Sequence, residues 1–441
     1  MPSGIYTFPE GFLWGTATAA HQVEGRNTND TWSAWEQETG RIVDGGTAEI
    51  ACDWWGGRWQ EDFDRAQSTF QNAHRMSIAW SRIQPAPDRW DEEALDKYIE
   101  MLKGLRSRRM VPMVTLHHFS EPLWVAELGG WENPEVIDLF AAFVRKAVDA
   151  LRPYCNLWVT INEPDVYMAG AYIDGTFPPG KKDLKIALQV MSRLVRAHAK
   201  AYRVIHELQP EAQVGSAYHY RKFIPATWLP MDRWIAKGYH LIFNDLFPRT
   251  LKDGVFNGIL KRERIPEAVG TQDFVGLNYY ANDLIRFDLL ASGEAFARRS
   301  FPKEALLSEN GFIASQPAGM IDAVKWGSQF GLPMFITENG VEDSQDILRP
   351  RYIVEHLHAL WRAINDNLPV LGYFHWSLVD NFEWERGWTQ RFGLWGLDVD
   401  SQMRIRRPSV DLYAEICRNN GISAEVVEKY APGTMPNLFP G

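Results

Sequence analysis

The chain has 441 residues, 45% of them hydrophobic, and a formal net charge of −10. The acidic balance argues against a nucleic-acid partner, because such proteins normally carry a basic face. No apolar run approaches the roughly 18 residues that would indicate a membrane span. The cysteines (Cys52, Cys155 and Cys417) show no Cys-x-x-Cys spacing, and Met1–Gly4 is not a basic region followed by an apolar stretch. These features predict a cytoplasmic protein without disulfides or a secretory signal.

Short apolar segments alternate with longer amphipathic ones along the chain. The short segments, rich in Val, Ile, Phe and Trp, are typical of buried strands, and the longer ones are typical of helices. The expected strands are Phe12–Ala17, His74–Ala79, Val111–Leu116, Leu157–Ile161, Gln213–Ala217, Phe274–Asn278, Met334–Thr337 and Val370–His375. The expected helices are Asp91–Arg108, Pro134–Leu151, Leu184–Leu208 and Pro350–Asn367, with Asn133 as the cap of the second.

Strands that alternate with helices pair in parallel through right-handed crossovers. The alternative, a doubly wound sheet, is disfavoured because no Gly-x-Gly-x-x-Gly turn follows the first strand. We predict an α/β fold in which residues 1–441 form a single (β/α)8 TIM barrel with extended βα loops at the active-site face. Asp283–Ala314 has no clear period and is expected to be a long βα loop or excursion at that face. We expect Tyr430–Gly441 to be a surface coil and Arg404–Arg407 a solvated edge.

Polar side chains lie at the strand ends, where a parallel barrel places its active site. Glu163 closes the fourth strand and Glu338 the seventh. Two carboxyl groups in one aromatic-lined pocket are the minimum for cleaving a glycosidic bond, one as acid/base and the other as nucleophile or base. Arg75 is the candidate that keeps the nucleophile ionised. The other polar or aromatic residues at strand ends are Gln22, His118, Asn162, Tyr218, His219, Asn278, Tyr280 and Trp376.

Simpler interpretations exist for single motifs. Asn162-Glu163-Pro164 on its own could be a helix start, with the glutamate favoured by the helix dipole. His117 and His118 could be core histidines or metal ligands. No third ligand stands at a useful spacing, so neither a metal nor another cofactor is expected.

Longer motifs resemble those of glycoside hydrolase family 1, and the match runs almost end to end. They are Phe8–Gly15 with Ala19–Gly25, Arg75–Ile83, and Gly372–Trp384, which is the most specific. The resemblance implies a β-glucosidase-type retaining β-glycosidase that acts by double displacement on terminal non-reducing β-D-glucosyl residues, and on β-galactosyl or β-fucosyl residues. Its partners would be small β-glycosides or short oligosaccharides.

The resemblance also implies roles for particular residues. Glu163 would be the acid/base and Glu338 the nucleophile. Arg75, Asn278 and Tyr280 would support this pair. The implied substrate-binding residues are Gln22, His118, Asn162, Trp376, Glu383, Trp384 and Phe392, with Trp376 as the platform under the sugar ring.

Membership of two branches of the family that the chain resembles is disfavoured. The phospho-β-glycosidase branch replaces the sugar-binding glutamate by a small residue and adds a lysine, whereas this chain has Glu383 and no lysine in Arg386–Gly396. The thioglucosidase branch replaces the acid/base by glutamine, whereas Glu163 is present here. An unphosphorylated O-glycoside is therefore expected.

The sequence also departs at some positions from the usual sequence of the family that it resembles. Phe119 stands where the family usually has tryptophan, which keeps an aromatic wall but removes an N–H donor. Trp395 and Gly396 stand in a segment that usually contains tyrosine, and they lie either near the sugar 6-position or in the core behind it.

Two alternative functions remain open: a transglycosylase with the same catalytic pair, and, less favoured because both glutamates are present, a sugar-binding pseudoenzyme. A retaining mechanism predicts that the two carboxyl groups lie about 5–5.5 Å apart. The charge of Glu338 is expected to raise the pKa of Glu163.

Overall fold

The computed structural model describes residues 4–291 and 296–440. Some predictions concern residues outside the described ranges. These residues are Met1–Ser3 at the start, 292–295 within the expected loop or excursion, and Gly441.

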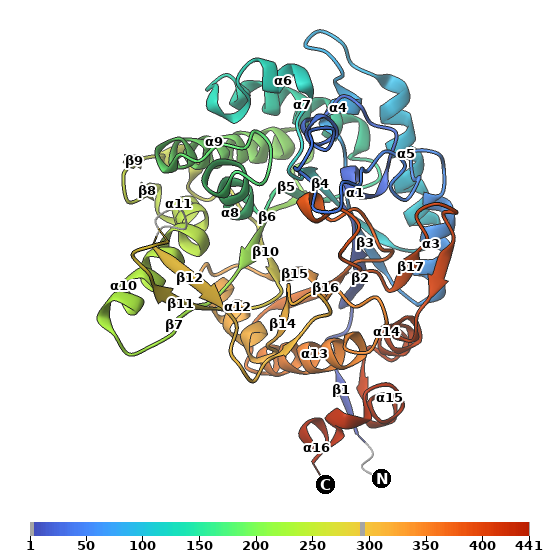
Figure 1. The fold of residues 1–441 in the computed structure, drawn as a ribbon. Coiled ribbons are helices and arrows are strands. Elements are labelled where there is room, and N and C mark those ends of the chain that lie inside the picture. The colour runs from blue at the N-terminus through green and yellow to red at the C-terminus, as the bar shows by residue number, and fades with distance from the viewer. Residues whose placement is uncertain (1–3, 292–295, 441) are drawn as a thin grey trace.

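Eight parallel strands close into a barrel at the centre of the molecule (Figure 1). They are β2 (Leu13–Ala17), β3 (Ala73–Ser77), β4 (Val111–His117), β5 (Leu157–Asn162), β6 (Gln213–Tyr220), β10 (Phe274–Tyr279), β15 (Met334–Asn339) and β16 (Val370–Trp376). Their order around the ring is their order in the chain, and β16 pairs with β2 to close it. The predicted fold class is confirmed, and all eight predicted strands are present.

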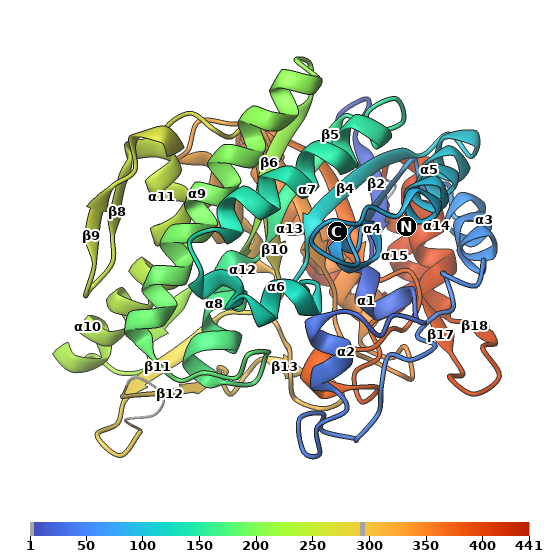
Figure 2. The ribbon, with the colours of Figure 1, turned by 90° about the horizontal axis from the view of Figure 1, so that it is seen from above.

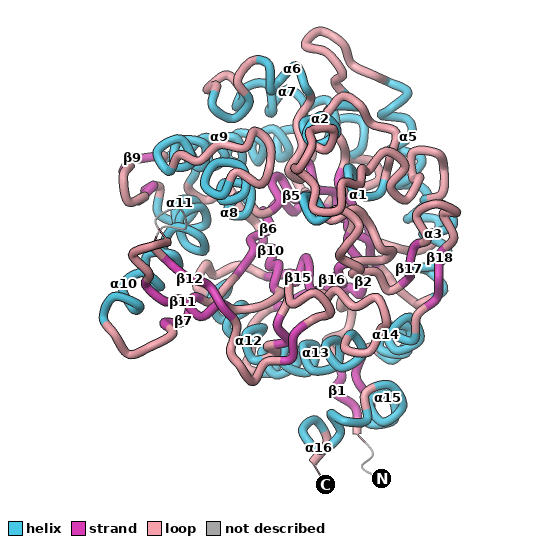
Figure 3. Tube along the Cα trace, viewed as in Figure 1, coloured by secondary structure: helices cyan, strands magenta, loops and turns pink. Residues whose placement is uncertain are grey.

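Helices surround the ring of strands, as the tube coloured by secondary structure shows (Figure 3). The four that were predicted are α5 (Glu92–Ser107), α7 (Val136–Leu151), α9 (Leu184–Leu208) and α13 (Arg349–Asn365). α9 has the predicted bounds. α7 begins two residues later than predicted, because the Asn133 side chain caps the turn that precedes it by accepting a hydrogen bond from the N–H of Glu135 (3.0 Å). Within the described ranges no helix is long and apolar enough to cross a membrane.

The segment predicted as a long βα loop or excursion lies between β10 and α12 (Ala318–Ser328) and contains short strands. β11 (Asp283–Phe287) pairs antiparallel with β12 (Ala297–Ser300) and parallel with β7 (Phe223–Pro225). This small sheet packs on α10 (Pro230–Tyr239) through a separate apolar cluster. The pairing with β7 was not predicted, because β7 belongs to the preceding crossover and the segment's own sequence does not reveal its partner. Figure 2 shows β11 and β12 at the same end of the barrel as α2 (Thr31–Trp35).

The C-terminal segment is also more regular than predicted. Within the range expected to be coil, a 3-10 turn spans Pro432–Thr434 and α16 spans Met435–Leu438. α16 lies near β1 (Ile5–Thr7) in Figure 1, and the Tyr6 hydroxyl donates a hydrogen bond to the carbonyl of Leu438. Two of the three prolines that suggested a coil, Pro432 and Pro436, lie in the first two positions of these short helices, where the missing proline N–H costs nothing.

The arginine run is not a solvated edge. Arg404 is buried and pairs with Asp62 at 2.8 Å, and Arg407 is buried and pairs with Asp380 at 2.8 Å. Of the run's three arginines, only Arg406 is exposed. The sequence did not reveal this, because each carboxylate partner comes from a distant part of the chain.

Candidate active site

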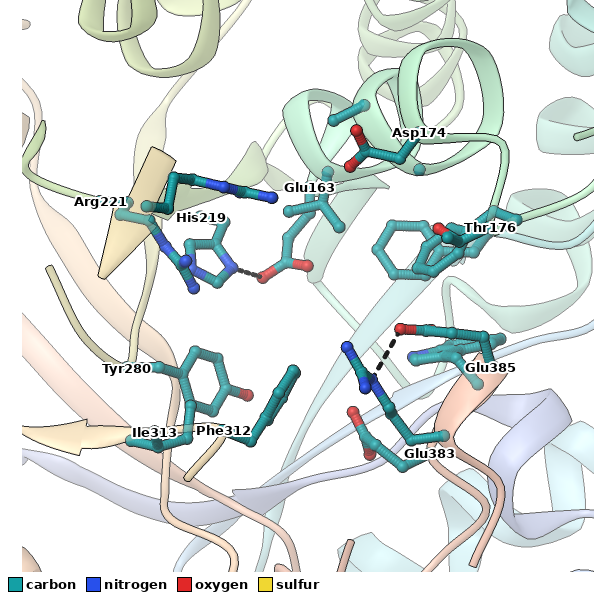
Figure 4. A pocket seen from close by; sticks show the side chains of 18 of the residues that line it. Glu163, Asp174, Thr176, His219, Arg221, Tyr280, Phe312, Ile313, Glu383 and Glu385 are labelled. Atoms are coloured by element: carbon teal, nitrogen blue, oxygen red, sulfur yellow. Dashed lines mark hydrogen bonds and ion pairs between the residues drawn. The ribbon is translucent and has the colours of Figure 1, made fainter. Parts of the chain in front are cut away.

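A cavity of about 780 Å³ opens at the C-terminal ends of the barrel strands. Eight of the twelve predicted site residues line it: His118, Glu163, Tyr280, Glu338, Trp376, Glu383, Trp384 and Phe392. The other four, Gln22, Arg75, Asn162 and Asn278, are buried behind its wall. Figure 4 shows Glu163, Tyr280 and Glu383 on different sides of the cavity. Every predicted site residue is therefore at or directly behind one cavity.

Glu163 lies at the junction between β5 and α8 (Pro164–Ala169). Its φ of +41° is a left-handed conformation that non-glycine residues rarely adopt and that the surrounding structure must hold. Its N–H donates to the carbonyl of Ala217 on β6 at 2.7 Å. The turn directs the side chain into the cavity, where Oε1 accepts a hydrogen bond from Asn278 Nδ2 (2.8 Å) and lies 3.1 Å from His219 Nδ1 (Figure 4).

Glu338 is held by two donors. Arg75 Nη1 donates to Oε1 at 2.6 Å, and the Tyr280 hydroxyl donates to Oε2 at 2.8 Å. Arg75 is only 1% exposed, and its Nη2 donates to Asn162 Oδ1 at 2.5 Å. One buried guanidinium therefore ties the ends of β3, β5 and β15 together and places a positive charge beside Glu338.

Two asparagines connect the groups around the carboxyls. Asn278 Nδ2 donates to Asn162 Oδ1 (3.2 Å) as well as to Glu163, and its Oδ1 accepts from the Thr337 hydroxyl (2.6 Å). Asn162 Nδ2 donates to His118 Nε2 at 3.0 Å. Burial lowers the pKa of His118 well below its usual value, so the ring is neutral and its hydrogen lies on Nδ1. That Nδ1 has no partner among the residues described.

A third carboxyl group occupies the far side of the cavity (Figure 4). Burial raises the pKa of Glu383 well above its usual value, and the charges of Glu385 and Glu338 add to the effect. Gln22 Nε2 donates to Glu383 Oε2 (3.1 Å) and to the carbonyl of Phe382 (2.8 Å). The other amide atom of Gln22, Oε1, is buried and has no partner in the described part of the chain.

Aromatic rings form the floor beside these groups. Trp376 and Trp384 have ring centroids 6.2 and 5.7 Å from that of His118. Phe119 is buried with a φ of +67°, and its ring lies 5.1 Å from Trp384. The predicted aromatic wall at Phe119 is therefore present.

Two ambiguous sequence features have a structural explanation. Trp395 lies in β17 (Trp395–Leu397), outside the cavity lining, with the guanidinium of Arg406 5.1 Å from its ring. It belongs to the region behind the site. His117 Nε2 lies 2.8 Å from Glu121 Oε1, so it is a partnered core histidine. Over the described ranges no three His, Cys, Asp or Glu side chains are grouped in a way that could hold a metal ion.

The pKa values of the two central carboxyls differ from the expectation. Burial alone would raise the pKa of Glu163, but His219, Asn278 and Arg75 together outweigh burial and lower it. Burial raises the pKa of Glu338 to about 7, against the opposing charge of Arg75 and with the charge of Glu163 adding to the rise. The expectation that Glu163 carries the raised pKa is therefore wrong for the free protein. The reason is His219, whose contact with Glu163 was not foreseen.

His219 was predicted to lie at the end of its strand, but no role was predicted for it. Its place at the C-terminal end of β6 was the signal that could have identified it. Other residues that line the cavity were also missed, because most of them come from loops without a recognisable pattern, while Asp174 ends a π-helical turn and Glu385 lies in a short 3-10 helix. Those labelled in Figure 4 are Asp174, Thr176, Arg221, Phe312, Ile313 and Glu385.

Comparisons with known proteins agree with this geometry. The sequence profile of glycosyl hydrolase family 1 matches residues 5–422. Beta-glucosidase A of Thermotoga maritima is 33% identical over 447 aligned residues, which cover 95% of this chain and 99% of that protein. The solved structure of a beta-glycosidase from Pyrococcus horikoshii superposes with a TM-score of 0.90 at 34% identity, covering 98% of each chain. A Thermotoga maritima beta-glucosidase in complex with glucoimidazole gives 0.89 at 30% identity, covering 95% of this chain and 100% of that one.

Proposed function

The chain belongs to glycosyl hydrolase family 1 and is a glycoside hydrolase, and from that premise we propose that it is a retaining β-glycosidase. Its substrates are unphosphorylated O-glycosides with a terminal non-reducing β-D-glucosyl residue, and also β-galactosyl or β-fucosyl residues. The observation that carries the proposal is the convergence of Glu163 and Glu338 on one cavity, each held by dedicated hydrogen-bond donors.

In the first step Glu338 attacks the anomeric carbon while Glu163 donates its proton to the glycosidic oxygen. The bond from the anomeric carbon to that oxygen breaks, the alcohol leaves, and a glycosyl ester forms on Glu338. In the second step Glu163, now a carboxylate, takes a proton from water as the water oxygen attacks the anomeric carbon. The ester bond breaks, the sugar leaves with its original configuration, and both glutamates return to their starting state.

The proton distribution between the two glutamates matters for this sequence of steps. Because the two carboxyls interact, they titrate as a pair. The first step uses the arrangement in which Glu163 holds the proton and Glu338 is ionised. Arg75 and Tyr280, which both donate to Glu338, stabilise that arrangement. The lowered pKa of Glu163 favours the carboxylate that the second step needs.

Polar atoms that have no partner among the described residues support the proposed binding of the sugar hydroxyls. His118 offers an N–H at Nδ1, Gln22 offers the acceptor Oε1, and Glu383 offers a carboxyl group. Buried polar groups without partners are costly unless a ligand pairs with them. A carboxyl group in this place also supports an unphosphorylated sugar, because a phosphate would face like charge. Trp376, Trp384 and Phe392 supply the apolar surface for the ring faces.

We further propose that residues 1–441 act as one catalytic domain. Support comes from the barrel, whose closure needs strands from both ends of the chain. Three buried free thiols, Cys52, Cys155 and Cys417, support a place in the reducing cytoplasm. The partners proposed are small β-glycosides or short oligosaccharides.

The roles of the two glutamates are tested with a set of aryl β-glucosides that differ in leaving-group acidity. Glu338→Gln is expected to lose several orders of magnitude in kcat for all of them. Glu163→Gln is expected to lose most for phenyl glucoside and little for 2,4-dinitrophenyl glucoside, whose leaving group needs no proton. A 2-fluoro-glucoside should label the peptide that carries Glu338. Label on another peptide, or near-normal activity of both variants, would contradict the assignment.

A further inference from the structure

His219, which has no role in the proposed chemistry, is packed firmly against Glu163. Its Nδ1 lies 3.1 Å from Glu163 Oε1, and the two side chains are only 11% and 8% exposed. The imidazole ring lies between two aromatic rings, with centroids 5.6 Å from Tyr280 and 5.9 Å from Phe243. The contact is therefore part of the built site rather than a chance approach of a mobile side chain (Figure 4).

The two oxygens of Glu163 differ in their surroundings. Asn278 Nδ2 donates to Oε1 at 2.8 Å, and His219 Nδ1 contacts the same oxygen. A carboxylate oxygen is only an acceptor, so His219 carries its hydrogen on Nδ1 in this contact. With two donors on Oε1, the proton that Glu163 transfers is directed to Oε2.

Other charges surround His219, but each of the two nearby arginines has a carboxylate partner of its own. Asp165 on α8 is buried, and burial raises its pKa well above the usual value, with the charge of Glu163 adding to the rise. Within the described residues, Glu163 is the carboxyl group that His219 Nδ1 contacts. The titratable and charged groups on the elements that meet at this contact are Asp165, Tyr280, Arg221, Asp283, the Arg75–Glu338 pair, and His240 and Asp245 of η3 (His240–Asp245), which carries Phe243.

We propose that His219 is a positioning residue for Glu163 that sets the upper pH limit of the first catalytic step. This inference rests on the proposed role of Glu163 as the acid/base. Only the acid form of Glu163 protonates a leaving group in the first step, whereas its carboxylate accepts a proton from water in the second step. The His219 contact favours the carboxylate.

The sign of the effect follows from the charges. An opposite charge at this distance favours the ionised form of a carboxyl group and lowers its pKa by about 1–3 units. His219 acts in this direction on Glu163, against the burial that would raise the pKa. Removing the imidazole charge should therefore raise the pKa of Glu163, so that its acid form persists to higher pH.

The test compares two variants of the full-length protein. His219→Phe keeps an aromatic ring between Tyr280 and Phe243 but removes both donor and charge. His219→Asn keeps a donor near the position of Nδ1 and removes the charge together with the ring. The basic limb of the kcat/KM profile for phenyl β-glucoside should move to higher pH by about 1–3 units in both variants. His219→Asn should retain more kcat than His219→Phe, because the carboxyl group keeps its second donor on Oε1.

Matched controls separate this inference from the proposed function. With 2,4-dinitrophenyl β-glucoside the first step needs no acid, so the variants should leave that profile unmoved. If the basic limb is absent in Glu163→Gln but unchanged in both His219 variants, the inference about His219 is wrong and the role of Glu163 stands. If the limb persists in Glu163→Gln, the proposed function is wrong. Thermal denaturation verifies folding, and His219→Asn carries the test alone if His219→Phe does not fold. A shift in His219→Phe without one in His219→Asn would also overturn the inference, since charge would not be its cause.

Discussion

Replacing Arg75 by methionine should damage both stability and the ionisation of Glu338. Arg75 is 1% exposed, and its charge lies 2.6 Å from the Glu338 carboxylate, whose side chain is 5% exposed. Removing one partner of a buried ion pair leaves an uncompensated charge and costs about 3–5 kcal/mol of unfolding free energy. Methionine has a similar length, so the loss should come from charge and hydrogen bonds rather than from an empty space.

This loss should depend on pH. The pKa of Glu338 is raised to about 7, so its protonated form favours the folded state below the usual carboxyl pKa, and that advantage is lost as pH rises through about 7. In Arg75→Met the folded-state pKa rises further. At pH 8 the carboxylate is buried without its counter-charge, and the full 3–5 kcal/mol is expected. At pH 5 the carboxyl takes up a proton, and only about 1–3 kcal/mol should remain, from the hydrogen bonds that Arg75 made to Asn162 and Thr115.

Urea denaturation at pH 5 and pH 8 measures the two losses, and kcat/KM between pH 4 and 9 measures the ionisation of Glu338. The acid limb should move to higher pH by about 1–3 units. Arg404→Met is the matched control, because Arg404 is equally buried and pairs with Asp62 at 2.8 Å outside the cavity. It should lose stability without moving the acid limb. Equal losses for Arg75→Met at both pH values, together with an unmoved limb, would falsify the role of Arg75 as the counter-charge of Glu338.

Two further substitutions give distinct outcomes. Glu383→Gln removes a buried carboxyl group whose pKa is raised, so the protonated carboxyl favours folding below its usual pKa and this advantage is lost as pH rises. The variant should therefore be more stable than the parent by roughly 1–3 kcal/mol at pH 8 and equally stable near pH 4. Its kcat/KM for glucosides should be about 100-fold lower. Equal denaturation midpoints at pH 8 would contradict this. Gly340→Ala would place a Cβ 1.9 Å from the carbonyl oxygen of Trp376, so the end of β16 must move and kcat/KM should fall at least about tenfold. Gly238→Ala on α10, with open space around its Cβ, should leave kcat/KM unchanged and gain up to about 1 kcal/mol of stability.

Features repeated along the chain were the predictable part of the fold. Buried parallel strands are continuous apolar runs, and all eight were found with only small boundary errors, such as β3 starting at Ala73 and ending at Ser77. α9 was predicted without error because Asp183 caps it and its apolar periodicity is long. Both signals lie within the segment itself, so a single sequence was enough to predict these strands and this helix.

Features that depend on distant partners were not predictable. The pairing of β11 with β7 joins two crossovers, and the ion pairs of Arg404 and Arg407 reach Asp62 and Asp380. The same holds in the site. The motifs were enough to predict that Glu163 and Glu338 meet in one cavity, but the lowered pKa of Glu163 depends on His219, which no motif includes. The type of a candidate catalytic side chain can be read from the sequence, whereas the effect of a neighbouring side chain on its pKa can be read only from the fold.

The closure of the barrel between β16 and β2 has a consequence for synthesis. β2 is the first barrel strand to leave the ribosome, yet the partner that covers its second edge, Val370–Trp376, is made last of the eight. Throughout most of translation the nascent chain therefore carries an unpaired edge of Leu13–Ala17, which is a template for pairing with other chains. A fragment that stops before Val370 would expose edges at both β2 and β15 and would lack Trp376 and Glu383. The appearance of hydrolase activity should thus report that the ring has closed, and protection of the growing chain from self-association is needed before that moment rather than after it.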